Sequence, residues 1–141
     1  MPHLLIIDAP YYEHLSKALV AGAEAVFKKS GASWDYQQVP GVLEIPAAVA
    51  IALDRGTYDG FVTLGCVIRG ETTHYEVVAF ESARAIMDLT VEHRLALGNG
   101  IQTVENEAQA VARAEPSQLN KGGHAAQAAL DMIELREKYR V

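Results

Sequence analysis

Short apolar segments alternate with helical patterns along the whole chain, and this alternation constrains the fold more than any other feature. The run Leu4–Ile7 contains no polar residue, which is typical of a strand buried on both faces. After it, Leu15, Leu19 and Ala23 recur at the spacing of one helix face, and Gly31 is suited to end that helix. Strand–helix–strand units connect parallel strands, so the sequence predicts a parallel sheet.

The same pattern continues to the end of the chain. The expected strands are Leu4–Ile7, Trp34–Val39, Gly60–Ile68 and Leu97–Val104. The first expected helix ends at Gly31, and the next two are Glu44–Arg55 and His74–Arg94, the latter started by a Thr73/Glu76 capping box. A short helix follows, capped by Asn106 and stopped by Pro116. The last helix starts at about Gly123 and carries Ala126, Leu130, Ile133 and Leu135 on its apolar side. We expect a single α/β domain over residues 1–141, a three-layer α/β/α arrangement with a roughly four-stranded parallel sheet of the flavodoxin-like type.

Charge and cysteine content restrict the class of ligand. Twelve lysines and arginines against eighteen acidic residues give a net charge of −6, whereas nucleic-acid binding needs a basic face. Cys66 is the only cysteine, which excludes an internal disulfide, and no pair of histidines has the spacing of metal ligands. Uncharged stretches are too short to span a membrane, and the first residues lack a signal-peptide pattern. We therefore expect a cytoplasmic chain without a metal, a nucleic acid or a membrane partner.

Ligands of open parallel sheets bind beyond the carboxyl ends of the strands. This rule selects the loops 8–12, 40–46, 68–74 and 104–106. The third loop, Arg-Gly-Glu-Thr-Thr before a helix start, offers backbone amides, a helix dipole and hydroxyl groups to an anion. His74 follows it and can exchange protons near neutral pH. Taken alone, the same residues also fit ordinary turn and capping roles with a surface histidine.

Four segments, in order along the chain, resemble the lumazine synthase family. They are Val39–Pro46 (VPGVLEIP), Leu64–Tyr75 (LGCVIRGETTHY), Thr103–Asn106 (TVEN) with Gln109, Ala110 and Arg113, and Asn120–Gly122 (NKG). No one of these motifs is specific by itself, but four in order within 141 residues are. The resemblance covers the chain from about Leu4 to Arg136.

The resemblance implies an enzyme of riboflavin biosynthesis. Its reaction condenses 5-amino-6-(D-ribitylamino)uracil with 3,4-dihydroxy-2-butanone 4-phosphate to give 6,7-dimethyl-8-ribityllumazine, phosphate and water. This transferase reaction needs no metal or redox cofactor. The resemblance also implies a homopentamer as the basic unit, in which each site is shared between neighbouring chains. It leaves open whether pentamers assemble further.

Motif positions imply roles for residues of the phosphate end of the site. His74 matches the histidine that shuttles protons, and Glu71 and Thr72 match the positions that hold the substrate phosphate through a backbone amide and a hydroxyl. Arg113 matches the phosphate-binding arginine, whose guanidinium offers a planar fork of donors. Lys121 matches a lysine of the same pocket.

The remaining implied roles concern the pyrimidine substrate. Val42, Leu43 and Glu44 match the segment that reads the ribityl chain and the ring. Cys66, Val67 and Ile68 match positions whose backbone groups line the polar edge of the ring. Tyr11 matches an aromatic residue that stacks on the heterocycle, and Asn99 matches a wall contributed by the neighbouring chain.

Three positions depart from the family's usual pattern and keep a second function open. Pro10 stands where arginine is common, Asn99 where an apolar or aromatic residue is common, and His124 where an acidic residue is common. A non-catalytic riboflavin- or lumazine-binding homologue is the alternative that these departures leave. A phosphorylated receiver domain shares the alternation of strands and helices but needs an aspartate at the end of its third strand. This chain has Gly65-Cys66-Val67 there, so we reject that function.

Overall fold

The computed structural model describes residues 1–141 and contains one sheet of four parallel strands. The strands are β1 (His3–Asp8), β2 (Ser33–Gln38), β3 (Gly60–Ile68) and β4 (Leu97–Val104), in the order β2-β1-β3-β4. This order agrees with the first strands of the flavodoxin-like arrangement. The predicted parallel α/β fold is therefore confirmed.

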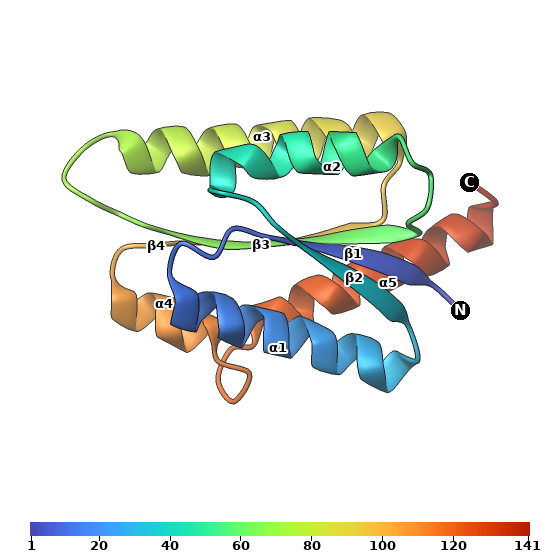
Figure 1. Cartoon of the computed structure of the whole chain (residues 1–141), viewed down its shortest axis with the longest axis horizontal. Coiled ribbons are helices and arrows are strands. Elements are labelled where there is room, and N and C mark those ends of the chain that lie inside the picture. Colours follow the sequence, from blue (N-terminus) through green and yellow to red (C-terminus); the bar gives the residue numbers. More distant parts are fainter.

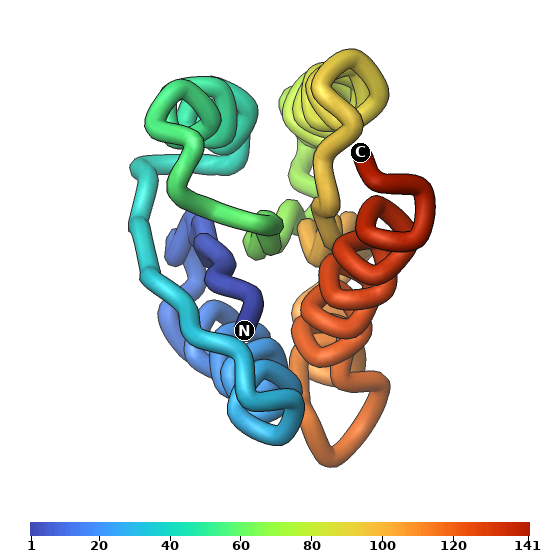
Figure 2. The backbone as a smooth tube through the Cα atoms, turned by 90° about the vertical axis from the view of Figure 1, so that its right-hand side faces the viewer, coloured from blue at the N-terminus to red at the C-terminus, as the bar shows by residue number.

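Helices cover both faces of this sheet and make a three-layer molecule. α1 (Glu13–Ser30), α4 (Glu107–Ala114) and α5 (Lys121–Tyr139) lie on one face, and α2 (Ile45–Leu53) and α3 (His74–His93) lie on the other (Figure 1). Figure 2, turned by 90°, shows the two helix layers separated by the strands. No helix combines the length and apolar character needed to cross a membrane.

Two apolar cores follow from this layering. One fills the space between the sheet and α1, α4 and α5 and includes Leu4, Leu19 and Phe27. The other lies under α2 and α3 and includes Ile7 and Val49. Adjacent strand residues point to opposite faces, so the uninterrupted apolar runs of β1 and β3 supply side chains to both cores.

Element bounds differ from the expected ones by one or two residues in most cases. Gly31, with φ of 80°, ends α1 as predicted, because the left-handed backbone there suits glycine. Asn106 caps α4 as predicted, since its side chain accepts a hydrogen bond from the backbone N–H of Gln109. A short 3₁₀ turn, Val42–Glu44, precedes α2 where one continuous helix from Glu44 was expected.

The capping box predicted at the start of α3 is wrong. Thr73 makes no side-chain cap bond, and Glu76 pairs with Arg69 instead of reaching back to the helix start. The neighbouring Thr72 takes part of the capping role, because its Oγ1 accepts a hydrogen bond from the His74 N–H at 3.2 Å. An arginine charge in the preceding loop outcompetes a neutral backbone amide for the Glu76 carboxylate.

The last helix also departs from the prediction. It begins at Lys121, two residues before the expected Gly123, because the Asn120 side chain caps it by accepting from the Gly123 N–H. Ala126 and Ile133 are buried as expected and Leu130 is half-buried, but Leu135 is 44% exposed. Leu135 therefore does not belong to the apolar side of this helix that packs on the sheet.

Glycines allow β4 and α5 to approach closely. A Cβ added to Gly98 would lie only 1.8 Å from the carbonyl oxygen of Ala125 on α5. A Cβ on Gly122 would lie 2.0 Å from the carbonyl oxygen of Leu19 on α1. Both contacts are with backbone atoms, which cannot move aside as a flexible side chain can. The position of α5 therefore depends on these missing side chains.

We predict that Gly98→Ala lowers the free energy of unfolding by about 3 kcal/mol, because α5 must shift away from the sheet. Chemical denaturation measures this change. Gly70→Ala is the matched control, since nothing lies within 4 Å of a Cβ at Gly70, and its free energy of unfolding should change by no more than about 0.5 kcal/mol. Equal stability of the two variants would contradict the close packing.

Candidate active site

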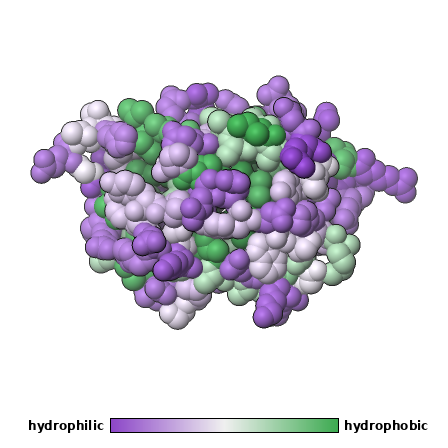
Figure 3. Space-filling view, in the orientation of Figure 1, coloured by the Kyte–Doolittle hydropathy of each residue, from purple (hydrophilic) through white to green (hydrophobic).

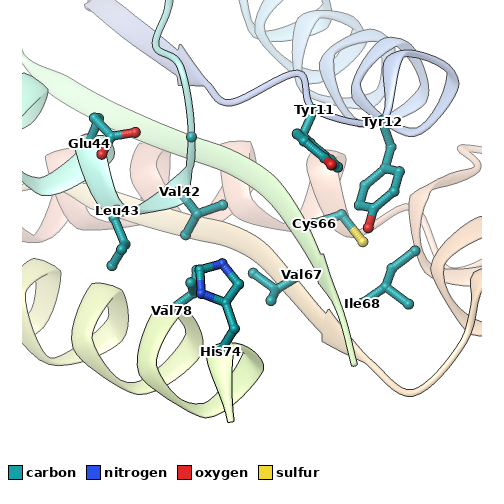
Figure 4. Close-up of a pocket in the computed structure, with 11 residues that line it drawn as sticks. Tyr11, Tyr12, Val42, Leu43, Glu44, Cys66, Val67, Ile68, His74 and Val78 are labelled. Atoms are coloured by element: carbon teal, nitrogen blue, oxygen red, sulfur yellow. The ribbon is translucent and has the colours of Figure 1, made fainter. Parts of the chain in front are cut away.

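Loops from the carboxyl ends of β1, β2 and β3 surround a cavity of about 350 Å³ (Figure 4). Most of the predicted site residues line it: Tyr11, Val42, Leu43, Glu44, Cys66, Val67, Ile68 and His74. Tyr12, Gly41 and Val78 also line it and were not predicted. Residues from four separate stretches of the sequence thus meet at the edge of the sheet where ligands bind in this class of fold.

The end of β3 forms the floor of the cavity. Cys66 and Val67 line the cavity although each is only 8% exposed. Gly65 lets the neighbouring turn come close, because a Cβ there would lie 2.9 Å from Cγ2 of Val42. Because Gly65 has no side chain, the turn 42–44 can pack directly against β3.

The turn Gly41–Glu44 forms one wall. Its backbone is closed by a hydrogen bond from the Glu44 N–H to the Gly41 carbonyl oxygen, at 3.1 Å. Val42 is buried and anchors the turn, whereas Leu43 is 43% exposed and Glu44 is exposed. An anchored turn with an exposed carboxylate can accept hydrogen bonds from hydroxyl groups of a ligand without moving its backbone.

His74 forms the opposite wall as the first residue of α3. Its ring points into the cavity toward Val42, with Val67 and Val78 on either side (Figure 4). Val78 lies one helical turn after His74 and is buried, so it supports the ring from below. The spacing of four residues was a usable sequence signal for Val78, but Val78 falls outside the motif.

Two adjacent tyrosines close the far side. The rings of Tyr11 and Tyr12 meet edge to face, with centroids 4.9 Å apart. Tyr11 is 78% exposed and is free to lie against a planar ligand, whereas Tyr12 is half-buried. Burial, and secondly the neighbouring Tyr11, raise the pKa of the Tyr12 phenol, which keeps this hydroxyl protonated.

The tyrosine loop is held by a buried carboxylate that sequence reasoning missed. Oδ2 of Asp8 accepts hydrogen bonds from the hydroxyls of Ser16 on α1 and Tyr36 on β2, each at 2.5 Å. Asp8 has no exposed surface, and burial raises the pKa of its carboxyl against the effect of these two hydrogen bonds. The cluster joins three elements directly beneath the segment that carries Tyr11.

The other predicted residues lie outside the cavity of this chain: Glu71, Thr72, Asn99, Arg113 and Lys121. Glu71 and Thr72 are exposed in the loop before α3. Asn99 lies on the edge strand β4, where its Oδ1 accepts hydrogen bonds from the Thr63 hydroxyl at 3.1 Å and the Ile101 N–H at 3.0 Å. Arg113 near the end of α4 and Lys121 at the start of α5 are half-buried.

No group of three or more histidine, cysteine, aspartate or glutamate side chains is arranged to hold a metal ion. Cys66 is a free thiol. Burial raises its pKa to about 11, and the positive charge of Arg113 acts weakly in the opposite direction. The floor of the cavity is therefore uncharged at neutral pH.

Comparison with known proteins decides the family. The family model described as 6,7-dimethyl-8-ribityllumazine synthase matches residues 2–137 of the chain. The chain belongs to this family.

Curated relatives agree along their whole length. A lumazine synthase of Bartonella bacilliformis is 59% identical over 140 residues, which are 98% of this chain and 92% of the relative. One of Agrobacterium fabrum is 56% identical, covering 97% of this chain and 96% of the relative. One of Novosphingobium aromaticivorans is 55% identical and covers 99% of each chain. All three bear the name 6,7-dimethyl-8-ribityllumazine synthase.

We predict that the Cys66 thiol of this lumazine synthase family member reacts slowly with alkylating reagents. A pKa of about 11 leaves roughly a hundredfold less thiolate at pH 8 than an ordinary cysteine has. Mass spectrometry after iodoacetamide treatment measures the rate without ambiguity, because Cys66 is the only cysteine. The rate should rise with pH up to about 11, and the unfolded chain serves as the control. Alkylation of the folded protein at the unfolded rate would contradict the burial.

Proposed function

We propose that the chain is an active lumazine synthase, which condenses 5-amino-6-(D-ribitylamino)uracil with 3,4-dihydroxy-2-butanone 4-phosphate. The observation that carries this proposal is the position of His74. Its ring enters the cavity that is lined by two segments of the family motifs, Gly41–Glu44 and Cys66–Ile68. Family membership and the geometry of one cavity thus support the same reaction.

The pyrimidine substrate occupies the cavity in this proposal. Tyr11 stacks on the heterocycle, since its ring is exposed beside the cavity. The backbone of Cys66–Ile68 meets the polar edge of the ring, and Glu44 accepts hydrogen bonds from the ribityl hydroxyls. The end of β3 is suited to bind the polar edge of the ring, because the sheet holds its backbone groups in fixed positions.

The phosphate of the second substrate binds at the start of α3. Glu71 contributes its backbone amide and Thr72 its hydroxyl, and the positive end of the helix dipole favours the anion. We assign Arg113 and Lys121 to the same phosphate from the neighbouring chain, as the family resemblance implies; neither lines the cavity of its own chain. Asn99 of that neighbour forms the remaining wall.

Catalysis then consists of orientation and proton transfer. The 5-amino group attacks the ketone and a first water leaves, which gives an imine. Phosphate is then eliminated to give an enol, which tautomerises to a ketone. The ribitylamino nitrogen attacks this ketone, and loss of a second water closes the ring. Holding two reactants together supplies a large part of the rate, on the order of 7–11 kcal/mol in favourable cases. His74 moves protons at the amine, the hydroxyl and the leaving phosphate.

The non-catalytic binding homologue is not favoured. Such a homologue would keep the cavity but would not need a histidine that points into it. His74 lines the cavity, which favours the enzyme. The departures at Pro10 and His124 lie outside the cavity, so Asn99, in the wall from the neighbouring chain, is the one departure within the proposed site. We place the enzyme in the cytoplasm, as its composition predicts.

Replacing His74 by Ala should lower turnover by roughly 10–10³-fold, less than the largest acid–base effects because the two substrates react by themselves. Stability should change little, since His74 is exposed. Steady-state kinetics on the two named substrates measures the effect. His93→Ala, an exposed histidine at the other end of α3, is the control. Wild-type turnover by folded His74→Ala would remove this residue from the mechanism.

The homopentamer is supported by an apolar stripe on α3. Val77, Phe80, Met87 and Val91 recur on one face of the helix and are 50%, 70%, 60% and 70% exposed. Large apolar side chains gathered on one helix mark a surface that another protein chain covers. Figure 3 shows polar atoms over most of the face that carries β2 and α1, with apolar atoms in smaller groups. A head-to-tail contact through α3 closes into a ring when the rotation between subunits permits, and the family resemblance implies a ring of five.

We predict a solution mass near five times the 15.3 kDa of one chain, or a multiple of that pentamer. Phe80→Glu should dissociate the assembly and abolish most turnover, because it places a charge in the contact. Lys29→Glu is the control, because Lys29 is exposed near the end of α1, on the opposite face of the sheet from α3. Light scattering at several concentrations measures the mass. An active monomer would refute the shared site.

A further inference from the structure

Arg69 lies at the junction between the loop before α3 and the loop before α4. Its backbone N–H donates to the carbonyl oxygen of Val104 at 2.9 Å, which extends the pairing of β3 and β4 by one residue. Its side chain then runs toward the first turn of α3. No role in the reaction assigned above involves this arginine.

The Arg69 guanidinium is engaged on several sides at once. Nε donates to both carboxylate oxygens of Glu105, at 3.1 and 2.9 Å, and Nη1 donates to Oε1 of Glu76. The guanidinium carbon lies 4.2 Å from the centre of the Tyr75 ring, in cation–π contact. These partners belong to the first turn of α3 and to the loop before α4, and only the planar fork of an arginine reaches all of them together.

The position of the Glu76 side chain depends on this ion pair more than that of an exposed carboxylate usually would. Its Oε2 atom is buried and has no hydrogen-bond partner, while Oε1 faces Arg69. The Arg69 guanidinium lowers the pKa of the Glu76 carboxyl, so the pair is charged at neutral pH. Without Arg69, the buried carboxylate oxygen of Glu76 would have no cation near it. The first turn of α3 would then have to move so that this oxygen could reach water.

We infer that Arg69 is a positioning residue of the reaction: through Glu76 and Glu105 it fixes the segment from Gly70 to His74 against the start of α4. It does not bind the substrate phosphate, although it is the arginine nearest to that loop in the sequence. Two carboxylates already balance its charge. The inference rests on the proposed roles of Thr72 and His74, which this segment carries.

The connection links two parts of the proposed site. Glu105 precedes Asn106, which caps α4, and α4 carries Arg113. Glu105 is itself held by Gln109, whose side-chain oxygen accepts from the Glu105 N–H at 2.8 Å. Arg69 therefore sets the first turn of α3 and the first turn of α4 relative to each other.

The test uses Arg69→Lys, which keeps the positive charge but cannot hold both carboxylates. We expect kcat to fall about tenfold, since a small displacement of a catalytic group has a large effect on rate. The KM for the pyrimidine should stay within about twofold, because its proposed contacts lie on other loops. Arg136→Lys is the control: its Nε donates to the Val141 carbonyl oxygen at the other end of the molecule, and both constants should stay unchanged.

A second measurement reports the loop without activity. Hydrogen exchange at the amides of residues 72–77 should be faster in Arg69→Lys than in the wild type, and unchanged in Arg136→Lys. Glu105→Gln provides a second variant should Arg69→Lys fail to fold. If the two residues act as one contact, the double variant should have nearly the same kcat as the worse single one.

Three outcomes would overturn the inference. One is wild-type kcat and exchange in Arg69→Lys. Another is a raised KM for the butanone phosphate at unchanged kcat, which would make Arg69 a phosphate ligand. The third is a loss of kcat in Arg69→Lys with none in Glu105→Gln. Failure of the proposed function is separate, because it would appear as absent turnover in the wild type while exchange still tests the contact.

Discussion

The pairing of β3 with β1 on one side and β4 on the other is the constraint on which the rest of the structure depends. Parallel pairing brings Asp8 beside Leu64 and Ile68 beside Val104, so the strand ends arrive at one edge of the sheet. Backbone hydrogen bonds continue beyond the strands, from Ala9 to Leu64 and from Arg69 to Val104. Each loop of the site therefore starts from a position that the sheet has already fixed.

Much of this framework could be predicted from the sequence because the relevant signals are local. Uninterrupted apolar runs indicated β1 and β3, and Gly31 and Asn106 marked helix ends by their own backbone and side-chain chemistry. One error arose where a distant group decides a local choice. Glu76 fits a capping box until Arg69 is placed beside it. The Leu135 error had a different cause: Leu135 follows Ile133 by two residues, about 200° around a helix, so its spacing never matched the face of Ala126 and Ile133, and it is 44% exposed.

The candidate site shows the same division. Motifs predicted Val42–Glu44, the end of β3 and His74, and these residues do line one cavity. Tyr12 and Val78 were not predicted, because their place in the cavity follows from packing, which a motif does not record. Tyr12 packs against Tyr11, and Val78 lies beside His74. The Asp8 cluster escaped it because Ser16 and Tyr36 approach from other elements. Spatial neighbours, unlike sequence neighbours, require the fold.

Charge finally connects assembly with chemistry. The chain carries a net charge of −6, and the one arginine in the loop before α3 is balanced by Glu76 and Glu105. A bound phosphate would thus meet backbone amides and a helix dipole there, but no unbalanced side-chain cation from the same loop. Arg113 and Lys121 lie outside the cavity of their own chain, with no carboxylate within salt-bridge distance of either. The proposed anion site at the start of α3 lacks a free cation, and Arg113 and Lys121 lack acidic partners. The two sets of groups are therefore complementary, and this complementarity is the physical argument for the proposed site between subunits.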